Sequence, residues 1–131
     1  MMTPQEVLNT AADIIAARGH GKQHYEDAVT GNVCAYGAMT AAATDGTDGR
    51  TADYSVMNVY GTPRAKRLVD QAARLLATHL RGPLDGYADE FDIVTHFNDA
   101  DTTDGPTLIR HMKEAATVAA VVVPESAPAV V

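Results

Sequence analysis

Cys34, His96 and Asp99 are the residues of this sequence whose types could together support nucleophilic catalysis. A thiolate is a strong nucleophile, and it needs a nearby base such as a histidine that a carboxylate orients. If Asn32 caps a short helix, Cys34 lies in its first turn, where the helix dipole lowers the pKa of a thiol. Sequence spacing places neither a base nor an oxyanion site beside Cys34. We therefore assign no catalytic residue and favour a buried, apolar role for this thiol, with a thiol-dependent hydrolase or transferase as the alternative.

Asn98 and Asp99 form the polar pair that most favours a binding site. In one interpretation both side chains bond backbone amides locally, in a turn before the last helix. In the other, both face the segment around Cys34 and line a small cleft, where Asp99 holds His96 in one tautomer. The residue types fit both interpretations, so Asn98 and Asp99 are candidate binding residues.

The histidines do not predict a metal site. His20 and His24 would lie about 13 Å apart in an extended strand, which is too far for both to bind one zinc ion. His79 lies on the apolar stripe of a predicted helix, and His111 lies beside the apolar face of another. We interpret both as packing residues. The sequence thus predicts neither a metal ion nor another cofactor.

Half of the ten basic residues lie on one predicted helix, and four of them are candidate binding residues on one face: Arg64, Arg67, Arg74 and Arg81. Such a face could contact nucleic acid or an acidic partner. However, the helix has no interleaved aromatic residues, and the net charge of −7 opposes binding to nucleic acid or anionic membranes. A solvated face is the favoured interpretation, and nucleic-acid binding is a weaker alternative.

Composition indicates one acidic, globular domain. The chain has 131 residues, 46% of them hydrophobic, and a single cysteine, which excludes an internal disulfide. We find no basic start followed by a long apolar stretch, and no apolar run long enough to span a bilayer. We expect a cytoplasmic protein without membrane contact, with one domain over residues 1–121 and an irregular tail over residues 122–131.

Local signals predict the helices. Thr3 and Glu6 form a capping-box sequence, and Pro4 suits the first helical position, so a helix is expected over residues 4–18. Apolar periodicity and further stop signals predict a short helix and two more long ones, at residues 34–43, at residues 63–81 and from about residue 105 onward.

A small β element is expected beside these helices. A turn signal at Thr30-Gly31-Asn32 predicts a β-hairpin formed by residues 23–28 and 32–35. Residues 91–97 fit a short strand and a helical turn equally well. The predicted fold class is therefore α+β and dominated by helices, with three main helices, one short helix and the hairpin. Its predicted core is Val7, Leu8, Ala11, Ile14, Ile15, Cys34, Ala38, Leu68, Ala72, Leu75, Leu76, Phe97, Leu108, Ile109 and Met112.

Several short motifs recur in a recognisable order: Ala16-Ala17-Arg18-Gly19-His20, Cys34-Ala35-Tyr36-Gly37-Ala38, a long helix, Phe97-Asn98-Asp99 with Thr102 and Thr103, and Leu108-Ile109. This order resembles a family of small uncharacterised proteins from actinobacteria and their phages, over roughly residues 7–116. His20 and Phe97 stand where that family usually has tryptophan. The resemblance implies a fold and a phage or prophage origin, but it implies no reaction.

These observations favour a non-enzymatic accessory protein that acts in the cytoplasm, that of the host if the chain is phage-encoded, by binding another protein. The absence of an assembled catalytic motif is the main reason. The last helix and the tail are rich in alanine and valine and could form a homodimer, but their periodicity fits packing within one chain equally well.

Overall fold

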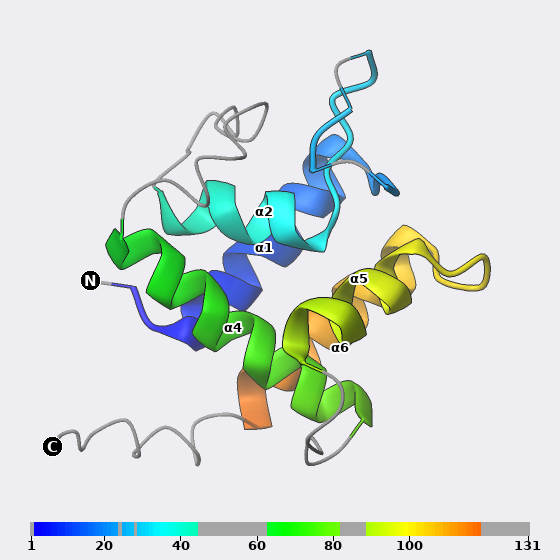
Figure 1. Cartoon of the computed structure of the whole chain (residues 1–131). Helices are drawn as coiled ribbons and strands as arrows, with labels where there is room; N and C mark the ends of the chain where they lie inside the picture. Colours follow the sequence, from blue (N-terminus) through cyan, green and yellow to red (C-terminus); the bar gives the residue numbers. More distant parts are fainter. Residues whose placement is uncertain (1, 24, 28, 45–62, 82–88, 119–131) are drawn as a thin grey trace, which may run out of the picture.

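The computed structural model describes residues 2–23, 25–27, 29–44, 63–81 and 89–118. This part of the chain contains five helices (Figure 1): α1 (Pro4–Arg18), α2 (Ala35–Ala43), α4 (Pro63–Arg81), α5 (Glu90–Asp99) and α6 (Gly105–Val118). The predicted tail and His24 lie outside the described residues.

The predicted α+β class is wrong for the described residues, which form helices and no strand. Where the hairpin was expected, Val33 makes only isolated bridges, one to His20 and one to Glu26. Gln23 has a φ of 70°, which interrupts an extended strand. The expected second strand, residues 32–35, loses its last residue to α2, which already begins at Ala35.

The segment for which strand and helical turn were equally favoured is part of a helix, α5. Asp89 caps this helix, because its side chain accepts a hydrogen bond from the backbone N–H of Asp92 at 2.9 Å. Ile93 and Val94 are its buried apolar residues. One polar residue, Asn98, is buried in its last turn and is central to the site described below.

The predicted start of α1 is confirmed. The Thr3 hydroxyl accepts from the backbone N–H of Glu6 at 3.1 Å, and the Glu6 carboxylate accepts from the backbone N–H of Thr3 at 2.8 Å. Pro4 occupies the first helical position. At the other end Gly19 adopts a φ of 102°, and its N–H closes the helix on the Ile15 carbonyl.

The core lies where α1 and α4 meet the other helices, since α1 packs against α2, α4 and α6, and α4 also packs against α2, α5 and α6 (Figure 1). Alanines allow these helices to approach closely, among them Ala11, Ala38 and Ala72, all fully buried. Ten of the fifteen predicted core residues are buried, and five are half-buried and pack against the core: Ile14, Leu68, Leu75, Phe97 and Ile109.

Helix α2 is the most deeply buried helix, and its glycine fixes the path of the preceding loop. All residues from Ala35 to Ala42 are buried. The Tyr25 carbonyl accepts a hydrogen bond from the Cys34 N–H at 3.2 Å. A Cβ atom at Gly37 would lie only 2.0 Å from the same carbonyl oxygen. The loop can therefore contact α2 only because residue 37 has no side chain.

None of the helices in the described residues is long and apolar enough to cross a membrane.

Replacing Gly37 with alanine tests the close contact between α2 and the loop at Tyr25. In a helix this change ordinarily stabilises a protein by up to about 1 kcal/mol. Here we expect Gly37→Ala to lower the free energy of unfolding by about 3 kcal/mol, because the new methyl group must displace the Tyr25 backbone. Urea denaturation measures the change. Gly105→Ala is the control, because its Cβ would meet a side-chain atom at 3.3 Å, and a loss as small as in this control would contradict the argument.

Candidate functional site

The side chain of Asn98 joins three separate parts of the chain. Asn98 is only 2% exposed. Its Oδ1 accepts hydrogen bonds from the backbone N–H of Ala35 at 2.9 Å and from Nε2 of His20 at 3.0 Å. Its Nδ2 donates to the Gly21 carbonyl at 3.0 Å and to Oδ1 of Asp99 at 2.9 Å. A backbone donor and a backbone acceptor thus fix the orientation of this amide, and its hydrogen-bonding capacity is filled.

The next two residues attach the end of α5 to the same loop. Oδ1 of Asp99 also accepts from the backbone N–H of Gln23 at 2.9 Å. The Lys22 ammonium donates to the Ala100 carbonyl at 2.6 Å. We call Asn98 and Asp99, with their hydrogen bonds, the Asn98 clamp. The clamp accepts from the N–H of Ala35, next to Cys34, and from the N–H of Gln23, whose φ of 70° departs from an extended strand.

A pocket of about 240 Å³ lies between α2 and α5, and we call it the α2–α5 pocket. Its mainly apolar lining is Tyr25, Cys34, Ala35, Tyr36 and Phe91, and its polar lining is Gln23, Thr95, Asn98 and Asp99. The rings of Tyr36 and Phe91 pack at a centroid distance of 5.0 Å. Phe91 is 40% exposed, whereas Tyr36 is buried. The pocket therefore has apolar walls beside the polar groups of the Asn98 clamp.

Cys34 is itself the N-cap of α2, so the alternative in which Asn32 caps this helix and Cys34 lies in its first turn is not what the structure shows. Its sulfur accepts a hydrogen bond from the Gly37 N–H at 3.4 Å. Burial raises the pKa of the Cys34 thiol from 9.0 to about 11, although backbone N–H groups at the helix start act in the opposite direction. The charge of Asp99 raises this pKa further. Desolvation thus outweighs the helix dipole, and the thiol stays protonated at neutral pH.

The structure does not bring His96 to the sulfur. His96 is exposed, and it lies two residues before Asn98, which is about 200° around the helix. It lines different cavities, together with Asp92 and Ala100, whereas Cys34 lines the α2–α5 pocket. Asp99 lines both the α2–α5 pocket and one of the cavities that His96 lines, but its described hydrogen-bond partners are Gln23 and Asn98. Cys34, His96 and Asp99 therefore do not form one hydrogen-bonded unit.

The arginine face of α4 is exposed to solvent at all four predicted positions: Arg64, Arg67, Arg74 and Arg81. Arg74 pairs with Glu90 of α5 at 3.3 Å. Lys66 pairs with Asp70 one turn later at 2.9 Å. The face thus carries exposed charge of both signs, and Arg81 also lines a cavity with His96 and His111.

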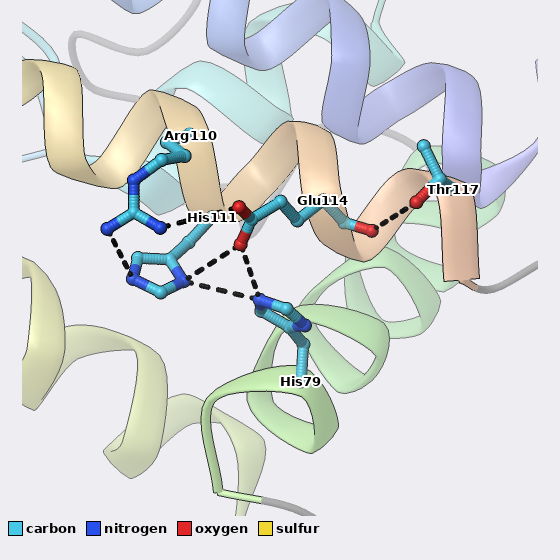
Figure 2. Close-up of polar contacts among 5 residues, drawn as sticks. All are labelled: His79, Arg110, His111, Glu114 and Thr117. Atoms are coloured by element: carbon cyan, nitrogen blue, oxygen red, sulfur yellow. Dashed lines mark hydrogen bonds and ion pairs between the residues drawn. The ribbon is translucent and has the colours of Figure 1, made fainter.

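A second polar cluster, which the sequence analysis missed, joins α4 to α6 (Figure 2). Nε2 of His79 lies 3.2 Å from Nδ1 of His111 and 3.2 Å from Oε1 of Glu114. Burial, followed by the charge of Arg110, lowers the pKa of His111. The two histidines are 32 residues apart, so no local pattern predicts their contact. The only sequence signal is His-x-x-Glu at positions 111 and 114, which share one helix face.

A family model described as a family of unknown function (DUF6197) matches residues 1–118. No curated protein and no solved structure was found to match the chain. The comparisons confirm the resemblance to uncharacterised proteins, while the actinobacterial and phage origin stays a prediction.

Removing the amide of Asn98 should unfold the clamp. Asn98→Ala leaves the buried Ala35 N–H and the half-buried Gly21 carbonyl without their partner, and an unpaired buried group costs about 1–3 kcal/mol. We expect a loss of about 3 kcal/mol or more in the free energy of unfolding, measured by urea denaturation. Asp99→Asn is the matched control, because it keeps the oxygen that Gln23 needs and should cost under about 1 kcal/mol. Equal losses in the two variants would contradict the central role of Asn98.

The thiol of Cys34 should react slowly. With a pKa of about 11 instead of 9.0, the thiolate fraction at pH 8 falls about 100-fold, so iodoacetamide should alkylate the native protein at least that much more slowly than the urea-unfolded chain. Because the folded state holds the proton more tightly, its stability should also fall as pH rises from 9.0 towards 11. Equal alkylation rates in the native and unfolded chains would show a reactive thiol.

Proposed function

We propose that this chain, which belongs to a family of unknown function (DUF6197), is a non-enzymatic accessory protein that acts by binding another protein. The α2–α5 pocket is the observation that carries this proposal. Its walls are aromatic, with Tyr25 and Tyr36 inside and Phe91 40% exposed beside them. Protein interfaces use such pockets to bury one anchoring side chain of the partner.

The size of the pocket favours a side chain over a free ligand. Sites for drug-sized molecules occupy about 300–1,000 Å³. The α2–α5 pocket, at about 240 Å³, is smaller and suits one aromatic or large aliphatic side chain. The Asn98 amide is already bonded to the backbone, to His20 and to Asp99, so an apolar occupant does not deprive it of a partner.

The charges around the pocket favour a basic partner segment. Asp99 lines the pocket, Asp92 lines the adjoining cavity, and Asp89 and Glu90 begin the same helix. The chain as a whole carries a net charge of −7. We therefore infer an occupant whose apolar anchor is flanked by lysine or arginine, because opposite charges around an interface speed association and select the partner.

The alternative functions have less support. A thiol-dependent enzyme would need an ionised Cys34, but burial raises the pKa of that thiol and His96 lines a different cavity. Nucleic-acid binding would use the arginine face of α4, and there Arg74 is already paired with Glu90. The order of sequence motifs adds a phage or prophage origin, and hence action in the host cytoplasm, to the proposal.

A displayed peptide library tests this proposal directly. Selection on the immobilised protein should enrich peptides with one aromatic or large aliphatic residue beside a basic residue. Phe91→Ser removes one wall of the pocket and should weaken the selected peptides about tenfold or more, measured by isothermal titration.

Val29→Ser is the matched control, because Val29 is 92% exposed and does not line the pocket. This variant should bind the peptides as well as the unchanged protein does. Selection that enriches no common anchor, or peptides that bind both variants equally, would refute binding through the α2–α5 pocket.

A further inference from the structure

Three electron-pair donors from two helices converge on one point beside α4 and α6 (Figure 2). Nε2 of His79 lies 3.2 Å from both other donor atoms, and Nδ1 of His111 lies 3.7 Å from Oε1 of Glu114. Zinc binds histidine nitrogen and carboxylate oxygen at about 2.0–2.2 Å, so the edges of a regular tetrahedron of ligands measure about 3.3–3.6 Å. Two of the observed distances, 3.2 Å each, are slightly shorter than such an edge, and the third, 3.7 Å, is slightly longer.

Hydrogen bonding alone satisfies this cluster poorly. A neutral His79 with its proton on Nε2 can donate that proton to Glu114 or to His111. Whichever of these two acceptors does not receive it lies beside Nε2 with no proton directed at it. If both histidines carry protons on these nitrogens, two donors meet at 3.2 Å. A dication accepts electron pairs from all three atoms at once, which removes this conflict.

We propose that His79, His111 and Glu114 bind one divalent transition-metal ion, Zn²⁺ or an ion of similar ligand preference, between α4 and α6. Two imidazoles and one carboxylate favour such an ion over Mg²⁺ or Ca²⁺, which prefer oxygen ligands. Three protein ligands leave a fourth position for water. The site differs from the α2–α5 pocket and does not depend on the proposed function.

The neighbouring residues position the carboxylate for this role. Arg110 donates to Oε2 of Glu114 at 3.4 Å, which leaves Oε1 directed at the two imidazoles. Arg110 also lies 3.5 Å from Nε2 of His111, on the side of the ring away from the site. When Nδ1 of His111 binds an ion, Nε2 carries the proton, so this one contact with Arg110 must open while the contact with Glu114 remains. The histidine side chains are each 23% exposed and that of Glu114 is 46% exposed, so an ion can enter without unfolding of the protein.

A titration of the tag-free protein with Co²⁺, followed by visible absorption, and competition with Zn²⁺ test the site. We expect one ion per chain. His79→Gln and His111→Gln should each weaken binding about tenfold or more, because each removes one ligand. Glu114→Gln keeps the shape of the side chain and removes its charge, and it should also weaken binding. His96→Gln is the matched control, because His96 is an exposed histidine outside the cluster.

Thermal unfolding supplies a second measurement. An ion that bridges two helices of the folded chain should raise the midpoint in the unchanged protein and in His96→Gln, but not in His79→Gln. Far-UV circular dichroism checks that the variants fold, which we expect because all three ligands lie on helix surfaces. The proposal is overturned if no binding saturates by about 100 µM free Zn²⁺. It is equally overturned if His79→Gln binds the ion as tightly as His96→Gln.

Discussion

The structure depends on the buried amide of Asn98. Its two acceptor and two donor interactions connect the end of α5, the loop after α1 and the first residue of α2. A buried polar group without a partner costs about 1–3 kcal/mol, so none of the three segments can shift alone without that penalty. The α2–α5 pocket is bounded by these same segments. Its shape is therefore set by a hydrogen-bonding constraint and does not rely on apolar packing alone.

The same constraint determines the chemistry of Cys34. Serine, threonine, asparagine and aspartate are the usual caps at a helix start, because their oxygens are strong acceptors. Sulfur is a weaker acceptor, but it tolerates burial better than a hydroxyl does. Asn98 satisfies the Ala35 N–H, and the sulfur of Cys34 accepts from the Gly37 N–H at 3.4 Å. The position thus favours a buried, protonated thiol.

The sequence predicts what local chemistry controls and fails where distant residues decide. The start of α1 follows from three neighbouring residues, Thr3, Pro4 and Glu6. The hairpin was predicted from a local turn signal, but Gln23, the first residue of its expected first strand, has a φ of 70° and donates its N–H to Asp99, 76 residues away. Asn98 and Asp99 were recognised as candidates by residue type, but the partners of Asn98 lie up to 78 residues away. The cluster at His79 was missed for the same reason, since each histidine alone fits a packing role.

The two candidate sites are linked through neighbouring residues of α5. Asn98 belongs to the clamp, and the ring of Phe97 meets the His111 ring edge-on, with centroids 5.3 Å apart. His111, a residue of the proposed metal site, thus contacts the residue that precedes Asn98 in the chain. Any effect of an ion on the pocket must be matched by an equal effect of the pocket's occupant on affinity for the ion, because coupling between two binding sites is reciprocal.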